Sequence, residues 1–367
     1  MTHQNTQGYE GRVRRLLEKT ASKEITLCLI RNEESSTKNL HYFSGFTGTS
    51  GFFAITDRKQ QIGTDSRYWI QAAEQSPFEL VQETKDNAQT LLKTICSKHK
   101  TIGYEAATTS VRSFQILQNQ LGDKIEWIPI DPLIEELRCV KDDIEIQIMK
   151  EAQRISAEAF MEWLNEVRPG RTEKFLAAHL EYLMKTKGAD DAAFSSIVAS
   201  GYRSALPHGR ASNKILEPGD IIVIDYGCSV DGYCSDITRT IALGPIDSLK
   251  EEVYGIVAQA QLEALKSAKA GMTGKELDFV ARTIIQKAGY GDHFGHGLGH
   301  GLGMQVHEAP SVSLRNEKPL PAGSVVTIEP GIYLEGSFGV RIEDDIVLLN
   351  DGMLNLTTLS KELLVLS

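Results

Sequence analysis

Two glutamates, Glu329 and Glu343, each lie seven residues from Gly336 within the stretch TIEPGIYLEGSFGVRIEDD (residues 327–345). Apolar runs flank the glycine on both sides, and this pattern predicts an antiparallel hairpin with its turn at Gly336. Pairing about that glycine places the two glutamates opposite each other on one face, with β-carbons about 5 Å apart. Carboxylates this close repel each other unless a cation lies between them, so the spacing predicts a cation site.

A second acidic hairpin is expected earlier in the chain. LEPGDIIVIDYG parallels LPAGSVVTIEPG 104 positions later, so Asp225 corresponds to Glu329, and the turn signal SVDG then leads into YCSDITRTI with Asp236. Whether that turn is centred between Val230 and Asp231 or one residue later, Asp225 and Asp236 share a face, because strand side chains alternate with period two. The two hairpins together predict four inward carboxylates.

Histidines form the second set of residues that could do chemistry. The glycine-rich run HGLGHGLGMQVHE, which lies between the two hairpins in sequence, carries His296, His300 and His307. The segment around His208 corresponds to the segment around His307, 99 positions later. We therefore expect these histidines near the carboxylates.

The helices expected before each hairpin also repeat. RPGRTEKFL with Thr172 parallels KAGMTGKEL with Thr273, 101 positions later, and both threonines are expected N-caps. Helices are predicted over 142–167, 172–187, 249–268 and 273–288, with Gly188 and Gly289 directly after two of them. An internal duplication of helix, helix, histidine and acidic hairpin predicts two similar halves related by a pseudo-twofold axis, with the carboxylates near that axis.

Four carboxylates and one or more imidazoles form an oxygen-rich donor set. Such a set is typical of sites for Mn²⁺ or a similar divalent ion, and it differs from the thiolate sets that bind structural zinc. The total charge of four carboxylates matches two divalent ions. In a two-metal site a shared water loses its proton near neutral pH, so the chemistry that we expect is hydrolysis.

Composition narrows the class of protein. At 367 residues the chain predicts two domains, and its formal charge of −10 without lysine or arginine clusters argues against nucleic acid and anionic membranes as partners. No apolar run approaches the roughly 18 residues of a membrane span, and the five cysteines form no CxxC pair, so a cytoplasmic location is predicted. Cys228 and Cys234 flank the first hairpin turn and are interpreted as core residues instead of ligands.

Residues 1–130 alternate short apolar runs with helical patterns, which predicts an α/β domain with a mixed sheet. Strands are expected at 25–31, 41–46, 51–56, 60–69, 101–106 and 125–130, and helices at 87–99 and 113–121. The run FTGTSG resembles a phosphate loop, but no helix pattern follows it and the lysine is missing, so we interpret it as a connection between strands. The boundary is expected near IDPL at 130–133, and residues 131–367 are predicted to form the duplicated α+β domain.

From Ile130 to the C-terminus the chain resembles the metal-dependent "pita-bread" peptidases, the group that includes methionine aminopeptidase, prolidase and aminopeptidase P. The matching pieces are IDYG, SDITRT, HGLGHGLGMQVHE, TIEPG and GVRIEDD. The first 130 residues are similar to the N-terminal domain of aminopeptidase P and prolidase in HYFSGFTGTSGFFAIT and GTDSRYWIQA. Methionine aminopeptidases lack that domain, so the resemblance narrows to the proline-specific branch.

The resemblance implies a set of five metal ligands. Asp225 would chelate one ion, His300 and Glu329 the other, and Asp236 and Glu343 would bridge them. All five positions are filled, which argues against a non-catalytic peptide-binding module, the remote alternative. Two divalent ions are implied, most often Mn²⁺, with Co²⁺ or Zn²⁺ as alternatives.

The resemblance also implies residues that act on the substrate. Glu329 would shuttle a proton, and His307 would stabilise the tetrahedral intermediate. His208 and His296 would line the proline side of the cleft. Arg341 would hydrogen-bond the acidic cluster and orient a ligand, and a charge-balancing salt bridge is compatible with that role.

The implied activity is that of an Xaa-Pro aminopeptidase acting on peptides, in a homodimer. The alternative is an Xaa-Pro dipeptidase (prolidase), which grips the terminal carboxylate of a two-residue substrate. Some dipeptidases carry a basic residue soon after the position of His307. Here APS follows Glu308 and the first cation is Arg315, which favours the aminopeptidase interpretation.

Overall fold

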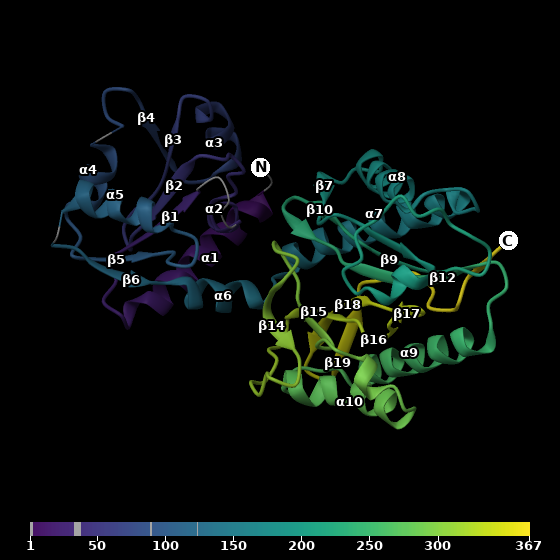
Figure 1. The fold of residues 1–367 in the computed structure, drawn as a ribbon. Coiled ribbons are helices and arrows are strands. Elements are labelled where there is room, and N and C mark those ends of the chain that lie inside the picture. The colour runs from purple at the N-terminus through teal and green to yellow at the C-terminus, as the bar shows by residue number, and fades with distance from the viewer. Residues whose placement is uncertain (1–2, 33–37, 89, 123) are drawn as a thin grey trace. The chain divides into compact units, whose positions relative to one another are not determined.

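The computed structural model describes residues 3–32, 38–88, 90–122 and 124–367. The chain divides into two compact units, Met1–Arg138 and Cys139–Ser367 (Figure 1). Every described helix is too short or too polar to cross a lipid bilayer.

Helix α6 (Asp131–Cys139) groups with the first unit, so the units divide after Arg138 instead of at residue 130. Two contacts tie it there. Lys19 Nζ lies 2.7 Å from Glu136 Oε2, and Arg138 Nη1 donates to Asn39 Oδ1 at 2.9 Å in a buried hydrogen bond.

The first unit contains a mixed six-stranded sheet in the order β4-β3-β2-β1-β5-β6. Its strands are β1 (Leu27–Asn32), β2 (Gly51–Ile55), β3 (Gln60–Asp65), β4 (Glu79–Glu83), β5 (Thr101–Tyr104) and β6 (Glu126–Pro129). Its other helices are α1 (His3–Ala21), α2 (Asn39–Ser44), α3 (Trp69–Gln75), α4 (Leu91–Cys96) and α5 (Val111–Leu121). Leucines of α4 and α5 pack on β1, β2 and β5 to form one apolar core. The predicted α/β domain with a mixed sheet is confirmed.

Several local predictions for this unit were wrong. Residues 41–46 were expected as a strand but fall in and just after α2, which ends at Gly45 with φ +77°. Leu40, Tyr42 and Phe43 are all buried, and a short run buried on every side lacks the periodicity that separates helix from strand. The FTGTSG run consequently joins a helix to β2 instead of joining two strands.

Other differences concern element ends and elements that were not predicted. The strand expected over 60–69 ends at Asp65, and Trp69 begins α3. Helix α1 and strand β4 have no counterpart among the predicted elements. The helix expected over 87–99 is the shorter α4, and Gln89 lies outside the described residues.

The helices of the second unit match the predictions. They are α7 (Asp143–Trp163) followed by η1 (Leu164–Glu166), α8 (Glu173–Thr186), α9 (Ser248–Ser267) and α10 (Gly274–Lys287). Thr172 accepts from Phe175 N and Thr273 from Glu276 N, so both predicted N-caps are confirmed. Gly188 and Gly289 follow α8 and α10 with φ of +110° and +90°, the left-handed conformation expected after a helix end.

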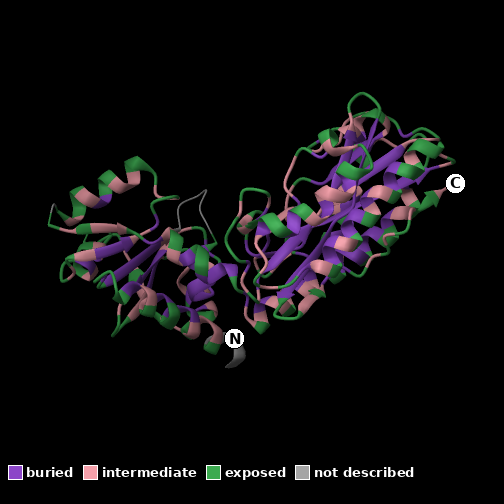
Figure 2. Ribbon diagram, turned by 90° about the horizontal axis from the view of Figure 1, so that it is seen from below, coloured by how far each residue is buried: buried purple, intermediate pink, exposed green. Residues whose placement is uncertain are grey.

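The strands of the second unit form four small sheets. They are β7 (Asp191–Ala192), β8 (Ile197–Ser200), β9 (Ile221–Tyr226), β10 (Cys228–Val230), β11 (Tyr233–Cys234), β12 (Ile237–Leu243), β13 (Gly299–Gly301), β14 (Glu308–Val312), β15 (Val325–Ile328), β16 (Gly331–Leu334), β17 (Phe338–Arg341), β18 (Asp344–Leu349), β19 (Gly352–Asn355) and β20 (Val365–Leu366). Short 3-10 turns lie at η2 (Gly201–Ala205) and η3 (Gly291–His293). In Figure 1 the strands lie between the α7–α8 pair and the α9–α10 pair. Figure 2 shows that these strands are the most buried part of the unit.

Each half of the second unit has its own apolar core. One core joins α7 and α8 to β9 and β12 and includes the fully buried Trp163, and the other joins α9 and α10 to β15, β17 and β18. Cys228 lies in the first core, as interpreted from the sequence. The predicted duplication of helix pair and acidic hairpin is therefore confirmed.

The second hairpin has the predicted register. Leu334 pairs with Phe338 around Gly336, whose φ is +73°, and Ile328 pairs with Asp344 in the same frame further out. Glu329 and Glu343 are therefore opposite each other, as predicted.

The two strands of this hairpin are nevertheless interrupted at the glutamates. Pro330 has no N–H to donate to a ladder, and the backbone N–H of Glu343 donates to Thr238 O, 3.1 Å away in the other hairpin. The site therefore lies where the sheet of one half gives way to contacts with the other half.

The first hairpin adopts the later of the two registers considered. Val230 pairs with Tyr233 around a two-residue turn, Asp231-Gly232, whose φ angles are +46° and +80°. Positive φ at both turn positions is typical of the type I′ turn, whose twist matches that of the flanking strands. Asp225 then lies opposite Thr238.

Candidate metal centre

A cavity of about 610 Å³ in the second unit brings the predicted site residues together. All nine of them line it: His208, Asp225, Asp236, His296, His300, His307, Glu329, Arg341 and Glu343. They come from both acidic hairpins, from the glycine-rich run and from the loop after β8. Residues separated by more than 100 positions in sequence therefore share one wall.

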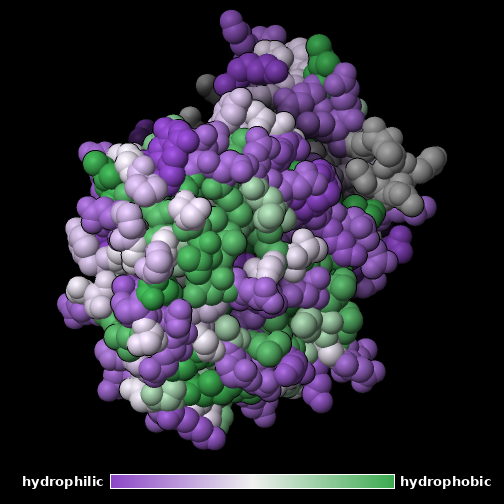
Figure 3. Space-filling view, turned by 90° about the vertical axis from the view of Figure 1, so that its right-hand side faces the viewer, coloured by the Kyte–Doolittle hydropathy of each residue, from purple (hydrophilic) through white to green (hydrophobic). Residues whose placement is uncertain are grey.

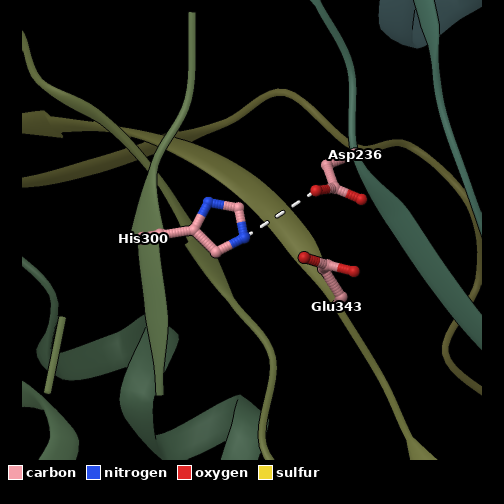
Figure 4. Close-up of side chains that lie close together, drawn as sticks. All are labelled: Asp236, His300 and Glu343. Carbon is pink, nitrogen blue, oxygen red and sulfur yellow. Dashed lines mark ion pairs between the residues drawn. The ribbon is translucent and has the colours of Figure 1, made fainter. Parts of the chain in front are cut away.

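A histidine and two carboxylates form the tightest group in this cavity. One ligand atom each from Asp236, His300 and Glu343 lies within 4.8 Å of the others, and Figure 4 shows the three side chains converging. His300 Nε2 is 3.8 Å from Asp236 Oδ2 and 3.3 Å from Glu329 Oε1. These separations leave room for a cation between the ligand atoms.

Hydrogen bonds orient the carboxylates of this group. Thr238 Oγ1 donates to Glu343 Oε2 at 2.6 Å, and Thr327 Oγ1 donates to Glu329 Oε1 at 3.3 Å. The backbone N–H of Asp236 donates to Asp345 Oδ2 at 3.0 Å. The carboxylates of Glu343 and Glu329 are thus oriented before any ligand binds, and the bond to Asp345 fixes the backbone that carries Asp236.

The electrostatics of the group call for a cation. Burial raises the pKa of Glu329 to about 8. Burial, together with the neighbouring carboxylates, raises the pKa of Asp236 and of Glu343 well above the ordinary range. Asp225 Oδ1 and Asp236 Oδ1 are buried with no hydrogen-bond partner among the described residues. Buried carboxylate oxygens without donors fit divalent ions, which would neutralise the repulsion and occupy the free lone pairs.

His300 is arranged as a ligand. Its Nδ1 lies 3.2 Å from the carbonyl of Gly301, which can only accept, so Nδ1 carries the proton and Nε2 offers its lone pair to the carboxylate side. Burial lowers the pKa of His300, which keeps the ring neutral. A neutral imidazole with its second nitrogen held by a carbonyl is the usual form of a metal-binding histidine.

His296 is committed to a different network. Its Nδ1 lies 2.8 Å from Gly297 O and its Nε2 lies 3.0 Å from Tyr333 Oη. Tyr333 Oη also accepts from Arg341 Nη1 at 2.8 Å. Burial lowers the pKa of His296 to about 4, so the ring is neutral and both of its nitrogens are engaged.

Arg341 links the histidine network to the acidic group. Its Nη2 donates to Asp225 Oδ2 at 2.7 Å, its Nε to Thr238 Oγ1 at 3.1 Å and its Nη1 to Pro207 O at 3.1 Å, in addition to Tyr333. Its side chain is 4% exposed. The guanidinium therefore holds both hairpins and the loop of His208 in one frame.

His307 lies beside the proposed ligand His300. The two ring centroids are 4.2 Å apart. Burial lowers the pKa of His307, and the nearby His300 lowers it further. The next residue, Glu308, accepts from Lys141 Nζ at 2.7 Å in a buried ion pair. This pair fixes the backbone beside His307.

Sequence reasoning missed several residues of the site. Thr238, Tyr333 and Asp345 lie an even number of positions from Asp236, Glu329 and Glu343, so the period of two already placed them on the cavity face. Phe194 and Ile197 also line the cavity, and their positions carried no such signal.

Comparison with known proteins decides the family. The sequence pattern of metallopeptidase family M24 matches residues 147–350, more than half of the chain, and that of the creatinase/prolidase N-terminal domain matches residues 12–140. The chain belongs to metallopeptidase family M24. It is therefore a hydrolase that cleaves peptides, and the predicted proline-specific branch and pita-bread fold are confirmed.

Three relatives of this M24 peptidase are similar over nearly its whole length. An Xaa-Pro dipeptidase of Pyrococcus furiosus is 42% identical, with 89% of this chain and 92% of the relative covered. The crystal structure of an X-Pro aminopeptidase from Thermotoga maritima is 46% identical with a TM-score of 0.92, and covers 96% of this chain and 99% of its own. The structure of an Xaa-Pro dipeptidase from Bacillus anthracis is 40% identical with a TM-score of 0.91, and covers 98% and 100%.

Proposed function

We propose that this M24 peptidase cleaves Xaa-Pro dipeptides, in which proline is the second residue. The observation that carries the proposal is that all nine predicted site residues line one cavity of about 610 Å³. Two of the three relatives described above are named Xaa-Pro dipeptidases. Their names favour the dipeptidase alternative over the aminopeptidase that the sequence led us to expect.

Five residues would hold two divalent ions: Asp225, Asp236, His300, Glu329 and Glu343. M24 peptidases depend on two metal ions, and bound ions of this kind polarise a scissile carbonyl and lower the pKa of water. The oxygen-rich donor set supports Mn²⁺ as the native ion, with Co²⁺ or Zn²⁺ as alternatives.

Glu329 is placed to move the proton. A hydrolysed prolyl bond needs a base that takes a proton from water and an acid that returns one to the departing proline nitrogen. Glu329 lies in the cavity wall beside His300, and its pKa of about 8 in the metal-free protein shows how strongly the surroundings favour its neutral form. A carboxylate at this position is close enough to His300 and the proposed ions to pass a proton between the attacking water and the departing nitrogen.

The histidines would act on the peptide. A neutral His307 carries one N–H, which it can donate where negative charge develops on the substrate carbonyl oxygen. His208, which also lines the cavity, would flank the proline ring. His296 would contribute the face of its ring, because Gly297 O and Tyr333 occupy its nitrogens. Arg341 would hold Asp225 and Tyr333 in position.

An Xaa-Pro aminopeptidase remains a second candidate because one specific observation favours it. Among the described residues that line the cavity, Arg341 is the one lysine or arginine, and it already donates four hydrogen bonds. A gripped terminal carboxylate would contribute a charge-assisted hydrogen bond of about 1.5 to 3 kcal/mol, or roughly 10- to 150-fold in specificity. The T. maritima structure is named for this activity.

Peptide length separates the two candidates. We expect kcat/KM for an Xaa-Pro dipeptide to exceed that for the matching Xaa-Pro-Yaa tripeptide by about tenfold or more, because only the dipeptide offers its carboxylate next to the proline ring. Peptides with alanine second should not be cleaved. Equal or faster cleavage of the tripeptide would establish the aminopeptidase. Arg315→Ala serves as the control, since Arg315 is exposed and does not line the cavity, and it should leave the ratio unchanged.

Removal of the metal should make stability depend on pH with a definite sign. Between its ordinary pKa near 4.5 and its folded value of about 8, Glu329 holds a proton in the folded metal-free protein and loses it on unfolding. The free energy of unfolding should therefore fall as pH rises through this window. We expect the unfolding temperature of chelator-treated protein to fall between about pH 5 and 8, and that of Mn²⁺-loaded protein to change less. A metal-free midpoint that rises over this range would contradict the assignment, and Glu329→Gln should make the fall shallower, with the remainder due to Asp236 and Glu343.

A homodimer is part of the proposal. The second unit exposes several large apolar side chains. On the face of the molecule drawn in Figure 3, a hydrophobic area is surrounded by hydrophilic side chains. Exposed apolar surface of this kind is typical of contacts between protein chains.

A further inference from the structure

One buried carboxylate closes the loop that carries His208. Glu173, the first residue of α8, is 0% exposed and accepts from Ser200 N and Oγ at 2.8 and 2.9 Å. Its other oxygen accepts from Ser212 N and Oγ at 2.9 and 2.6 Å and from Arg203 Nε at 2.9 Å. The two ends of the segment 200–212 therefore meet on a single side chain.

Arg203 extends this clamp across the loop. Its Nη2 donates to Arg210 O at 2.6 Å, two residues beyond His208. Gly339 N donates to Ser204 Oγ at 2.9 Å, so the loop is also fixed against strand β17. Burial of Glu173 is compensated by five donors, and losing the charge would leave those donors without their shared acceptor.

The second half of the unit contains a matching arrangement on a different loop. Asp278 of α10 is 0% exposed and accepts from Arg282 Nε at 2.7 Å and from Leu298 N at 2.9 Å. Arg282 then donates to Phe294 O at 2.8 Å and to His296 O at 2.7 Å. A buried carboxylate and an arginine thus close the segment 294–298, which carries His296.

The two clamps are not copies of each other in sequence. Glu173 is the first residue of α8, whereas Asp278 is the fifth residue of α10. Arg203 lies in the loop that it closes, whereas Arg282 lies on the helix. In each half a buried carboxylate and an arginine close a histidine-bearing loop, although they occupy different positions in the two halves. Stabilisation of the helix ends alone would not require either carboxylate to bind such a loop.

We propose that Glu173 and Asp278 are positioning residues for the two histidine-bearing loops of the cavity, Glu173 for His208 and Asp278 for His296. The inference rests on the proposed function, since it assigns these histidines to the peptide. Both carboxylates bind backbone and side-chain donors of the loops and their arginines, and neither carboxylate lines the cavity. Their effect on catalysis should therefore be carried by the histidine of the same loop.

Double-mutant cycles test this pairing. The single variants are Glu173→Gln and Asp278→Asn, each made in the wild type and in the His208→Ala and His296→Ala backgrounds. We expect Glu173→Gln to lower kcat/KM about tenfold or more in the wild type and in His296→Ala, but less than about twofold in His208→Ala. Asp278→Asn should show the converse pattern. Metal content should stay at the wild-type value in Glu173→Gln, Asp278→Asn, His208→Ala and His296→Ala.

Each other outcome overturns the inference. Equal losses of kcat/KM in both histidine backgrounds would show that the carboxylates act on the fold in general, and lost metal would show that they act on the metal centre. If a variant fails to fold, Arg203→Gln and Arg282→Gln replace it, because each removes bonds to the carboxylate and to the loop while the buried carboxylate stays in place. If the wild type cleaves no Xaa-Pro peptide, the proposed function fails by itself, and the same cycles are then measured as binding of an Xaa-Pro peptide by calorimetry.

Discussion

Replacing either of the two proposed bridging carboxylates, by Asp236→Ala or Glu343→Ala, is expected to remove at least one of two metal ions and nearly all of the peptidase activity. Both side chains are buried, both lie within 4.8 Å of His300 through their ligand atoms, and both have a pKa raised by burial and by neighbouring carboxylates. A bridging ligand serves both ions, so its loss cannot be compensated by one ion alone. The loss of activity should exceed the roughly 10- to 100-fold loss that is typical when a residue that hydrogen-bonds to a metal ligand is replaced.

Metal analysis of protein saturated with Mn²⁺ measures this prediction directly. The wild type should hold two ions per chain, and each variant one or none. Glu151→Ala is a suitable control, because Glu151 is a half-exposed carboxylate paired with Arg154 on the outer side of α7. One ion per chain in the saturated wild type would contradict the two-metal assignment. Thermal unfolding of each variant separates loss of metal from loss of fold.

His208→Ala and His307→Ala are expected to keep both metal ions and to lower the rate of hydrolysis by about 100-fold or more, as for a lost donor to the transition state. Both residues line the cavity, and neither belongs to the group of Asp236, His300 and Glu343. The ring centroid of His307 is only 4.2 Å from that of His300, a proposed metal ligand. The His307→Ala variant is therefore the stricter test of whether these histidines bind the peptide or the metal.

Measuring both the metal affinity and kcat of each histidine variant decides the role of these residues. Much weaker metal binding in His307→Ala would make His307 a ligand and would contradict its role as a donor. His293→Ala is the matched control, because this histidine is exposed in η3, close in sequence to the glycine-rich run, and does not line the cavity. It should change neither metal content nor rate.

The sequence by itself determined the features that depend on local geometry. The equal distances of Glu329 and Glu343 from Gly336 predicted a register that the β16–β17 and β15–β18 pairs confirm. Thr172 and Thr273 marked the helix starts, because a threonine side chain can satisfy the free N–H groups of a first turn. Since strand side chains alternate with period two and turns demand particular residues, such patterns can be followed along the chain without knowing the tertiary structure.

Local patterns were insufficient where burial or long-range bonds decide the conformation. Residues 41–46 belong to helix α2 and the residues directly after it. All of them except His41 are buried, so the run lacks the alternation of polar residues that would reveal a strand or a helix face. Pro330 marks the break beside Glu329 in the sequence, but on the other strand the N–H of Glu343 donates to Thr238 O, in a residue more than 100 positions away. No pattern along the chain contains that bond.

The same limit applies to the site. Nine of the residues that line the cavity were predicted as site residues from the sequence, because their types and spacing carry the chemistry. Only the tertiary structure decided that Arg341 is engaged by Asp225, Tyr333 and Pro207, that His296 has no free nitrogen, and that Glu173 closes the loop of His208. Hydrogen bonds between distant segments exist only when the folded backbone brings both partners within about 3 Å, and the sequence order of the partners does not encode that approach.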